Sequence, residues 1–494
     1  MYERLIKVVA NLKSPRILLV GDFMLDIYTY GDALRISPEA PVPVLKITKT
    51  EYSGGGASSV AMDLAALEAK VTCIGIIGND ANGEKLKKIL SNPNIDTSGI
   101  IVSQNRPTIS KQRLIGLAQH RHQQQLFRMD NEVTDDLSTE ETSVIIETYK
   151  KHIKDCDIVC LQDYNKGLLT NDVCSQMIEI ANKENKKVLV DPSPTSDYSK
   201  YKSATLITPN RKETSIAVGF AVEDMQNAAQ AAKKLHDDLN LQAAVITLDK
   251  EGAYLYTSDF NGIIPTRPRN VYDVTGAGDM VLATIAVVLA AGNDYKTAVE
   301  LSNIAGGLEV EKFGVATVSI DEIINEIIGQ NRGKTGKLKT LENLCTELKW
   351  HRSQKEKIVF TNGCFDILHR GHIEYLKFCK EQGNIVVVGL NSDSSVKKIK
   401  GPERPLNNQH DRAAILAALE SVDYITIFDE PDPLELIKKT KPDVLVKGED
   451  WAQKGVVGQE FVEANGGKVV LAKFVKDKSS TSIIEKIKSL LKKE

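Results

Sequence analysis

The chain contains 494 residues, of which 26% are charged, 42% hydrophobic and 5% aromatic, and its formal net charge is -3. This length predicts about three domains, with two large ones equally compatible, and either arrangement can bury a substantial core. The nearly balanced charge excludes a general attraction to nucleic acid or to anionic membranes, so we expect chemistry on small molecules.

Cysteine usage and apolar runs indicate the compartment. Seven cysteines without a Cys-x-x-Cys pair argue against a disulfide framework and against a structural zinc site, and they favour a reducing environment. Residues 1–12 carry scattered charges and lack the apolar core of a signal peptide, so we expect no secretory signal. The longest apolar run, 280–291, is too short to cross a bilayer. These features predict a cytoplasmic protein without membrane insertion.

The first regular pattern is a β-branched and leucine-rich run from Arg16 that stops at Gly21-Asp22, as a buried parallel strand does. Similar runs, separated by helical periodicity, follow at 71–78, 158–163, 187–191, 206–209 and 244–248. This alternation predicts an α/β fold with a mostly parallel sheet that helices cover on both faces. The carboxyl end of the first strand is where an α/β sheet places ligands.

Two segments, 28–48 and 108–129, interrupt this alternation. They alternate apolar and polar residues, and the first contains Pro38, Pro41 and Pro43. We therefore expect antiparallel strands that are set apart from the main sheet and form a β lid over the site.

A glycine turn at 273–279, Asp-Val-Thr-Gly-Ala-Gly-Asp, is followed by a predicted helix over 279–291. Such a turn directs backbone N–H groups at an anion, and the positive end of the helix adds to the attraction. Asp279 lies in the first helical turn, where it can accept the proton of an attacking hydroxyl, and we expect the helix dipole to keep it ionised at neutral pH. The arrangement fits phosphoryl transfer to an alcohol, although Gly-Ala-Gly-Asp alone is equally well a turn and a helix cap.

Residues 329–340 are rich in glycine and in basic residues and nearly free of apolar ones, which predicts a linker between domains at 1–328 and 341–494. After an amphipathic helix over 341–350, the second domain contains strand patterns at 357–361, 385–390, 424–428 and 444–447. This series predicts a smaller Rossmann-like domain.

In the second domain, a strand leads into the loop Gly363-Cys364-Phe365-Asp366 and then into a helix that we expect over 369–382. His369 and His372 lie at the start of this helix and share one face. Two donors at a helix N-terminus can bind the α-phosphate and the departing pyrophosphate of a nucleotide, which fits nucleotidyl transfer without a protein nucleophile. Zinc binding would need further ligands from Cys364 or Asp366, and neither flank continues a ligand-spacing pattern.

The segments 54–61 (Gly-Gly-Gly-Ala-Ser-Ser-Val-Ala), 210–213 (Asn-Arg-Lys-Glu) and 273–279 together resemble the ribokinase-like carbohydrate kinase family, over residues 10–325. The resemblance implies that Asp279 is the catalytic base and that ATP binds with Mg²⁺, for which Glu213 is a ligand. It implies nucleotide contacts from Asn210, Arg211, Lys212, Glu213, Gly276, Ala277 and Gly278. Candidate sugar-binding residues are Asp22, Asp26, Gly55, Gly56 and Ser59, with Lys166 for a phosphate or simply a solvated loop lysine.

Residues 340–494 resemble the nucleotidyltransferase superfamily with an H-x-G-H motif, which includes cytidylyltransferases and adenylyltransferases. Supporting segments are Arg404-Pro405 before a helix at 411–419, residues 447–450 (Lys-Gly-Glu-Asp), and Ser479-Ser480-Thr481 before the last helix. The resemblance implies that His369 and His372 are catalytic. It implies nucleotide contacts from Gly363, Phe365, Lys400, Arg404, Lys447, Ser480 and Thr481. The motifs alone do not separate ATP from CTP.

The order of the two domains, together with residues 35–44, resembles the bifunctional family of heptose 7-phosphate kinases and heptose 1-phosphate adenylyltransferases of bacterial lipopolysaccharide core synthesis. This implies phosphorylation of D-glycero-β-D-manno-heptose 7-phosphate at C1, a separate phosphatase, and then adenylyl transfer from ATP to give ADP-heptose and pyrophosphate. It also implies a homodimer built through the lid strands.

Two departures from the family pattern bear on the sugar. Ser59 replaces a usual asparagine, and Ser193-Pro194 replaces a usual Lys-Gly, which could alter how a hydroxyl or a distal phosphate is bound. The alternatives are therefore the same two reactions on another sugar phosphate or nucleotide, or a chain in which one domain is an inactive ligand sensor. Retention of Asp279, His369 and His372 argues against a sensor.

Overall fold

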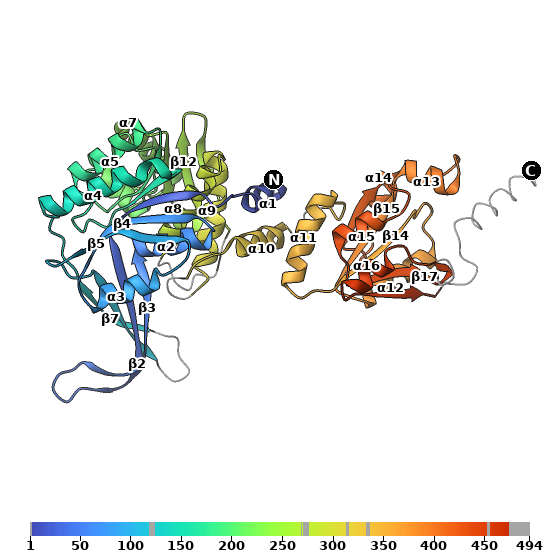
Figure 1. Cartoon of the computed structure of the whole chain (residues 1–494), viewed down its shortest axis with the longest axis horizontal. Helices are drawn as coiled ribbons and strands as arrows, with labels where there is room; N and C mark the ends of the chain where they lie inside the picture. The colour runs from blue at the N-terminus through green and yellow to red at the C-terminus, as the bar shows by residue number, and fades with distance from the viewer. Residues whose placement is uncertain are drawn as a thin grey trace, which may run out of the picture. The chain divides into compact units, whose positions relative to one another are not determined.

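The computed structural model describes residues 2–117, 124–267, 269, 276–312, 316–331, 336–451 and 455–473. The chain divides into two compact units, Met1–Ile327 and Ile328–Glu494 (Figure 1). Within the described ranges, none of the helices combines the length and the apolarity needed to cross a membrane.

The first unit is built on a nine-stranded sheet with the order β13-β12-β11-β10-β9-β8-β1-β4-β5. The strands are β1 (Arg16–Gly21), β4 (Lys70–Gly78), β5 (Ile95–Ser103), β8 (Ile158–Gln162), β9 (Lys187–Asp191), β10 (Leu206–Ile207), β11 (Ala243–Thr247), β12 (Ala253–Thr257) and β13 (Asn261–Ile264). All neighbours pair in parallel up to β11, and β12 and β13 are antiparallel additions at one edge. The predicted α/β fold with a mostly parallel sheet is confirmed, whereas β5, β12 and β13 were not predicted.

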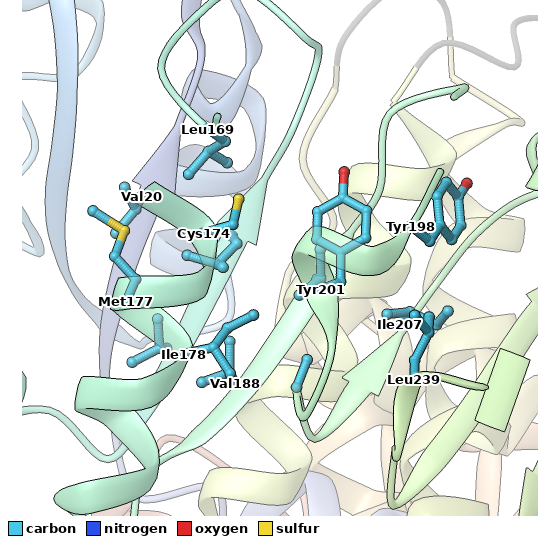
Figure 2. Packing of buried hydrophobic residues seen from close by; sticks show 14 of the residues in the cluster. Val20, Leu169, Cys174, Met177, Ile178, Val188, Tyr198, Tyr201, Ile207 and Leu239 are labelled. Carbon is cyan, nitrogen blue, oxygen red and sulfur yellow. The ribbon is translucent and has the colours of Figure 1, made fainter. Parts of the chain in front are cut away.

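Helices cover both faces of this sheet (Figure 1). The helices from the start of the chain to the boundary between the units are α1 (Tyr2–Ala10), α2 (Ala57–Ala66), α3 (Ala81–Ile89), α4 (Thr139–His152), α5 (Asn171–Lys183), α6 (Arg211–Val218), α7 (Met225–Leu239), α8 (Ala277–Ala290), α9 (Tyr295–Glu309) and α10 (Ile320–Asn331), which runs past that boundary. Helices α4, α5 and α7 pack on one face, where residues such as Val20, Met177, Val188 and Ile207 form a continuous core (Figure 2). Helix α8, almost entirely buried, packs with α2 and α9 on the other face.

A second, four-stranded sheet forms the predicted lid, with the order β3-β2-β6-β7. Its strands are β2 (Phe23–Ile36), β3 (Pro43–Gly56), β6 (Ser110–Leu117) and β7 (Gln124–Asn131). The β2–β3 and β6–β7 ladders are antiparallel as predicted, but β2 and β6 are parallel, so the expectation is wrong for the central ladder. Both strands begin beyond the carboxyl end of a parallel strand of the main sheet, β2 after β1 and β6 after β5, and so run in the same direction, with Leu25 N–H donating to the Ile109 carbonyl.

The second unit contains a five-stranded parallel sheet with the order β16-β15-β14-β17-β18, which confirms the predicted Rossmann-like unit. Its strands are β14 (Ile358–Gly363), β15 (Ile385–Asn391), β16 (Tyr424–Phe428), β17 (Val444–Gly448) and β18 (Lys468–Ala472). Its helices are α11 (Leu341–Ser353), α12 (Arg370–Glu381), α13 (Asp393–Lys400), α14 (Gln409–Ala417), α15 (Leu434–Thr440) and α16 (Gln459–Ala464). Two hydrophobic clusters lie on the two sheet faces. Strand β18 was not predicted.

The segment before α11 pairs with this second sheet. Lys339 N–H donates to the Ile425 carbonyl, and Ile425 N–H donates to the Lys337 carbonyl, both at 2.8 Å. The Lys339 ammonium forms a buried ion pair with Glu347 at 3.0 Å. Residues 332–335 of the predicted linker lie outside the described residues.

In each of the two main sheets, the strand that comes first in the sequence lies in the interior, with later strands on both of its sides. Strand β1 lies between β8 and β4, and β14 lies between β15 and β17. In open α/β sheets, the crevice at the carboxyl end of such a strand is where ligands bind. The fold therefore offers one candidate crevice in each unit.

Two candidate active sites

The candidate base of the first unit, Asp279, is the third residue of α8 and is only 6% exposed. The Gln162 amide donates to Asp279 Oδ1 at 2.9 Å, and the Tyr164 hydroxyl donates to the same atom at 3.3 Å. Gln162 also donates to Asp191 at 2.8 Å, so a single amide bridges the two carboxyl groups. Neither Gln162 nor Asp191 was among the predicted site residues, and only their position at strand ends could have indicated them.

The glycine turn in front of α8 has the shape that an anion site requires. Gly276 is the N-cap of α8 with a φ of 98°, a conformation that favours glycine. A Cβ at Gly276 would lie 2.4 Å from Glu309 Oε1, whereas a Cβ at Gly278 would meet nothing within 4 Å. The turn is thus tightly packed against Glu309 at Gly276, whereas there is open space next to Gly278. Asp273, Val274 and Thr275 lie outside the described residues.

The surroundings of Asp279 act against the ionisation that its place in the first helical turn favours. Burial raises the pKa of this carboxyl well above its ordinary value, and the nearby Asp191 raises it further, while the hydrogen bond from Tyr164 acts in the opposite direction. The helix dipole favours ionisation, but it is outweighed because the side chain is removed from water. A carboxylate with a raised pKa is the stronger proton acceptor.

Asp279 opens into a cleft of about 180 Å³ that the structure assembles from six elements and loops. Its lining residues are Tyr164, Asp191, Thr208, Asn210, Glu213, Thr247, Gly276, Gly278 and Asp279. Asn210 and Glu213 form a reciprocal cap at the start of α6, in which each side chain accepts the other residue's backbone N–H. The predicted Arg211 and Lys212 do not line this cleft: Arg211 pairs with Glu251 at 2.6 Å, and Lys212 is exposed.

Two carboxyl groups in the cleft have raised pKa values. Burial, with a contribution from Asp191, raises the pKa of Glu213 to about 7. Burial raises the pKa of Asp191 to about 6, against hydrogen bonds from Gln162 and Thr208. Two poorly neutralised carboxyl groups facing one cleft are the oxygen donors that a magnesium ion prefers. The residues present therefore fit the divalent cation that the sequence implied, with Asp191 as an unexpected second donor beside Glu213.

The predicted sugar-binding residues lie at the base of the lid. Asp22 accepts backbone N–H groups from Tyr164 at 2.9 Å and from Lys166 at 3.3 Å, so it positions that loop. Burial and the neighbouring Asp163 raise the pKa of Asp22 to about 6. Asp26 pairs with Arg113 at 2.9 Å.

Small residues make room around these carboxylates. A Cβ at Gly55 would lie 2.9 Å from the Asp26 carboxyl group, and Gly56 has a φ of 54° at the N-cap of α2. Ser59 is buried in α2 beside Asp279. The Lys166 ammonium pairs with Glu132 at 2.8 Å. Ser193, the second departure, is fully buried against the Tyr201 hydroxyl and does not line the cleft.

In the second unit, His369 is the N-cap of α12, and its ring stacks on that of His372 with centroids 3.9 Å apart. The Phe365 ring also packs against His372, at an angle of 56° and with the centroids 5.3 Å apart. Burial, with a contribution from His369, lowers the pKa of His372 to about 4, so this imidazole is neutral at pH 7. Within the described ranges, His372 Nδ1 is buried without a hydrogen-bond partner, as expected of an atom reserved for a ligand.

The other predicted nucleotide-binding residues of this unit lie in and after strands and helices of the second sheet. Gly363 ends β14, and a Cβ there would lie 3.0 Å from the Phe365 ring. Burial lowers the pKa of Lys447 to about 8, and its ammonium bonds to the Asn362 side chain. Arg404 pairs with Asp366, and Lys400 ends α13. Ser480 and Thr481 lie outside the described residues.

A buried arginine that the sequence analysis did not single out contacts several of the loops at the carboxyl ends of the second sheet. Arg412 is 1% exposed and donates to the carbonyls of Asn407 (3.0 Å), Cys364 (2.6 Å) and Asn391 (2.8 Å). It also pairs with Asp393 at 2.7 Å. An arginine directly before two alanines, on the buried side of a helix, was the available signal.

Comparison with known proteins gives the same division of the chain. Residues 14–322 match the model of the pfkB family carbohydrate kinases, and residues 360–486 match a cytidylyltransferase-like model. "Bifunctional protein HldE" of Sulfurimonas denitrificans is 43% identical over 96% of this chain and 98% of its own length. The protein of the same name from Geobacter metallireducens is 42% identical over 97% of this chain and 96% of its own length.

Solved structures agree with the fold of the first unit. Arabidopsis thaliana ribokinase, complexed with ribose and ATP, superposes with a TM-score of 0.51 and 18% identity, covering 64% of this chain and 99% of that one. Phosphofructokinase-2 from Escherichia coli, in complex with substrates and products, superposes with a TM-score of 0.54 and 20% identity. The superposition covers 64% of this chain and 100% of that one. At these identities the likeness concerns the fold alone.

Proposed function

Because the chain belongs to the family of the bifunctional HldE proteins, with a pfkB carbohydrate kinase region before a cytidylyltransferase-like region, we propose that it catalyses two steps of ADP-heptose synthesis for the lipopolysaccharide core. The first unit transfers a phosphoryl group from ATP to C1 of D-glycero-β-D-manno-heptose 7-phosphate. The second unit joins D-glycero-β-D-manno-heptose 1-phosphate to AMP from ATP and releases pyrophosphate.

In the kinase step, the oxygen of the C1 hydroxyl attacks the γ-phosphorus of ATP and ADP leaves. Asp279 accepts the proton of that hydroxyl. Gln162 and Tyr164 orient this carboxylate through their hydrogen bonds to Oδ1. The backbone N–H groups of the Gly276–Gly278 turn, at the positive end of α8, stabilise the charge on the transferring group. The observation that carries this proposal is that Asp279 and the turn line one cleft.

A magnesium ion completes the nucleotide side of the kinase cleft. When bound, Mg²⁺ neutralises charge on the ATP phosphates. Glu213 and Asp191 are the carboxyl groups that would hold such an ion, and Asn210 keeps Glu213 in place by the reciprocal cap. Arg211 and Lys212 act on the nucleotide only from outside the cleft.

In the adenylyl step, the sugar phosphate oxygen attacks the α-phosphorus of ATP and pyrophosphate leaves. His372 donates from a neutral ring to the phosphate oxygens, with His369 stacked beside it. Gly363 and Phe365 shape the loop, and the cations of Lys400, Arg404 and Lys447 attract the triphosphate. Ser480 and Thr481 are proposed to donate hydroxyls to it, as in the resembling superfamily.

The remaining parts of the proposal concern assembly and location. Exposed apolar side chains on the lid, Leu34, Ile36, Ile47 and Phe127, support a homodimer that buries them. A separate phosphatase acts between the two steps, and the protein works in the cytoplasm. The catalytic domains are residues 1–328 and 341–494, joined by 329–340, of which 337–339 already pair with the second sheet.

Mass identification of products tests the function. The purified chain is incubated with ATP, magnesium and D-glycero-β-D-manno-heptose 7-phosphate, with and without a phosphatase. We expect the 1,7-bisphosphate alone without phosphatase, and ADP-heptose with pyrophosphate when phosphatase is present. Turnover of a different sugar phosphate, or of CTP in the second step, would instead support the alternative substrates. Binding of both ligands without any product would support a sensor.

A further inference from the structure

The inner face of the lid carries a group of basic side chains whose charges are unequally neutralised. On β6, Lys111 lies opposite Asp26 of β2 and Asp130 of β7, and Arg113 lies opposite Tyr28 and Arg128. Side chains two residues apart on a strand share a face, so these groups form one patch. Lys166, in the loop after β8, adds a further cation next to it.

Each carboxylate of the patch is already committed to another cation. Asp26 pairs with Arg113 at 2.9 Å. Asp130 accepts two bonds from Arg128, at 2.9 and 2.8 Å. Glu132 pairs with Lys166 at 2.8 Å.

Lys111 is the cation left over. Its two cross-strand neighbours are acids, yet both acids are held by arginines, and within the described ranges Lys111 has no ion-pair partner. Its ammonium lies over the Tyr164 ring, 4.8 Å from the centroid. Burial lowers the pKa of Lys111, and although Asp26 opposes this, the nearby Lys166, Arg113 and Arg128 lower it further. A half-buried ammonium among like charges favours an incoming anion.

The position of Lys111 relative to the reaction centre defines which anion fits. Tyr164 connects the two, since its ring lies beneath the Lys111 ammonium while its hydroxyl donates to the Asp279 carboxylate. Lys111 is therefore separated from the base by one tyrosine side chain, and it stands on the lid rather than among the residues that line the nucleotide cleft. An acceptor sugar whose hydroxyl reaches Asp279 extends its far end toward the lid.

We propose that Lys111 binds the phosphate monoester at the non-reacting end of the acceptor sugar and so makes the first unit specific for phosphorylated sugars. Lys166 and Arg113 contribute to the same subsite, but each is already paired, so Lys111 provides most of the discrimination. This inference rests on the proposed kinase function. It assigns to the chain's own Lys111 the role that the sequence suggested for Lys166.

Steady-state kinetics of the full chain tests the assignment. Wild type, Lys111→Met and Lys111→Arg are compared with D-glycero-β-D-manno-heptose 7-phosphate, with the same heptose lacking its phosphate, and with varied ATP. We expect Lys111→Met to raise KM for the phosphorylated sugar about tenfold or more, because a charge-assisted bond is lost. We expect KM for ATP and turnover of the unphosphorylated heptose to stay unchanged, and Lys111→Arg to recover most of the affinity.

Lys85→Met provides a matched control, because the ammonium of Lys85 in α3 also lies over a tyrosine ring, that of Tyr52 in the lid strand β3, 4.2 Å from the centroid. It should leave both acceptors unaffected. The assignment is overturned if Lys111→Met lowers activity equally on the two heptoses, or if it raises KM for ATP instead. Wild-type chain without any turnover of the heptose 7-phosphate would refute the proposed function itself, which is a distinct outcome.

Discussion

At the scale of single residues, the carboxyl groups of the kinase cleft depend on one another. Gln162 bridges Asp191 and Asp279, and Asp191 is the charge that most raises the pKa of Asp279 after burial. The proton affinity of the candidate base Asp279 is therefore set partly by Asp191, at the end of β9. A mutation of Asp191 should therefore change the pKa of Asp279 although Asp279 itself is not replaced.

The pH dependence of the kinase step follows from this coupling. Asp279 must be ionised to accept a proton, so kcat/KM should fall on acidification, in a pH range above the ordinary aspartate pKa of about 3.9. Asp191→Asn removes a negative charge and keeps a hydrogen-bonding side chain. It should lower the pKa of Asp279 and move the acid limb to lower pH. Profiles of kcat/KM for both proteins from about pH 5 to about pH 8 measure this; a limb that stays in place, or moves to higher pH, would contradict the coupling.

Only some residues of the candidate sites could be predicted from the sequence. Asp279, His369 and His372 could be found because motifs surround them, and Asn210 and Glu213 because their spacing is that of a helix cap. Asp191, Thr208 and Lys111 stand in no motif, and they reach their sites only through strand order and cross-strand register. Such long-range pairing is not encoded in local spacing.

At the scale of elements, most strands of the two main sheets and the capped helices were predictable, whereas β5, β12, β13 and β18, which lie at or next to sheet edges, were not. β18 and β13 are short, and each completes a sheet edge through pairing with a neighbour rather than through a pattern of its own. The parallel β2–β6 ladder was missed for the same reason, since both strands read as hairpin strands. The segment 337–339 is a further edge addition, hidden within a stretch that reads as a linker.

This edge addition predicts how the second unit should be truncated. A fragment that starts at Gly336 keeps the pairing to Ile425 and the buried Lys339–Glu347 ion pair, whereas one that starts at Thr340 loses both. We expect the longer fragment to be more stable by about 3 kcal/mol, because a buried carboxylate that loses its cation is costly. Urea unfolding of the two fragments measures the difference. Lys339→Met in the longer fragment separates the ion pair from the backbone pairing, and equal unfolding free energies would exclude a role for the segment.

At the scale of the whole molecule, the two candidate sites consist of separate sets of residues. The kinase cleft is lined only by residues of the unit Met1–Ile327, and the histidine pair lies within Ile328–Glu494. Each unit has its own sheet and its own hydrophobic core. The chain is in this sense two enzymes connected by a peptide.

Two substitutions test this independence. Asp279→Asn should abolish sugar phosphorylation, with a loss of about a thousandfold or more for a missing base, and leave pyrophosphate release from heptose 1-phosphate intact. His372→Ala should do the reverse, by about a hundredfold or more for one lost transition-state donor. Both reactions are followed on the same preparations, with melting curves to show that the fold is kept. Comparable loss of both activities from either change would refute separate sites.

The placement of β1 and β14 has a consequence for how the protein is made. Each is the first strand of its sheet to leave the ribosome, yet each needs one neighbour on either side, and for β1 the later one is β8. A growing polypeptide therefore carries Asp22 long before Tyr164 or Asp279 has been translated. Nucleotide and sugar cannot assist the early folding of the first unit, which must reach its shape through its own apolar surface while synthesis continues.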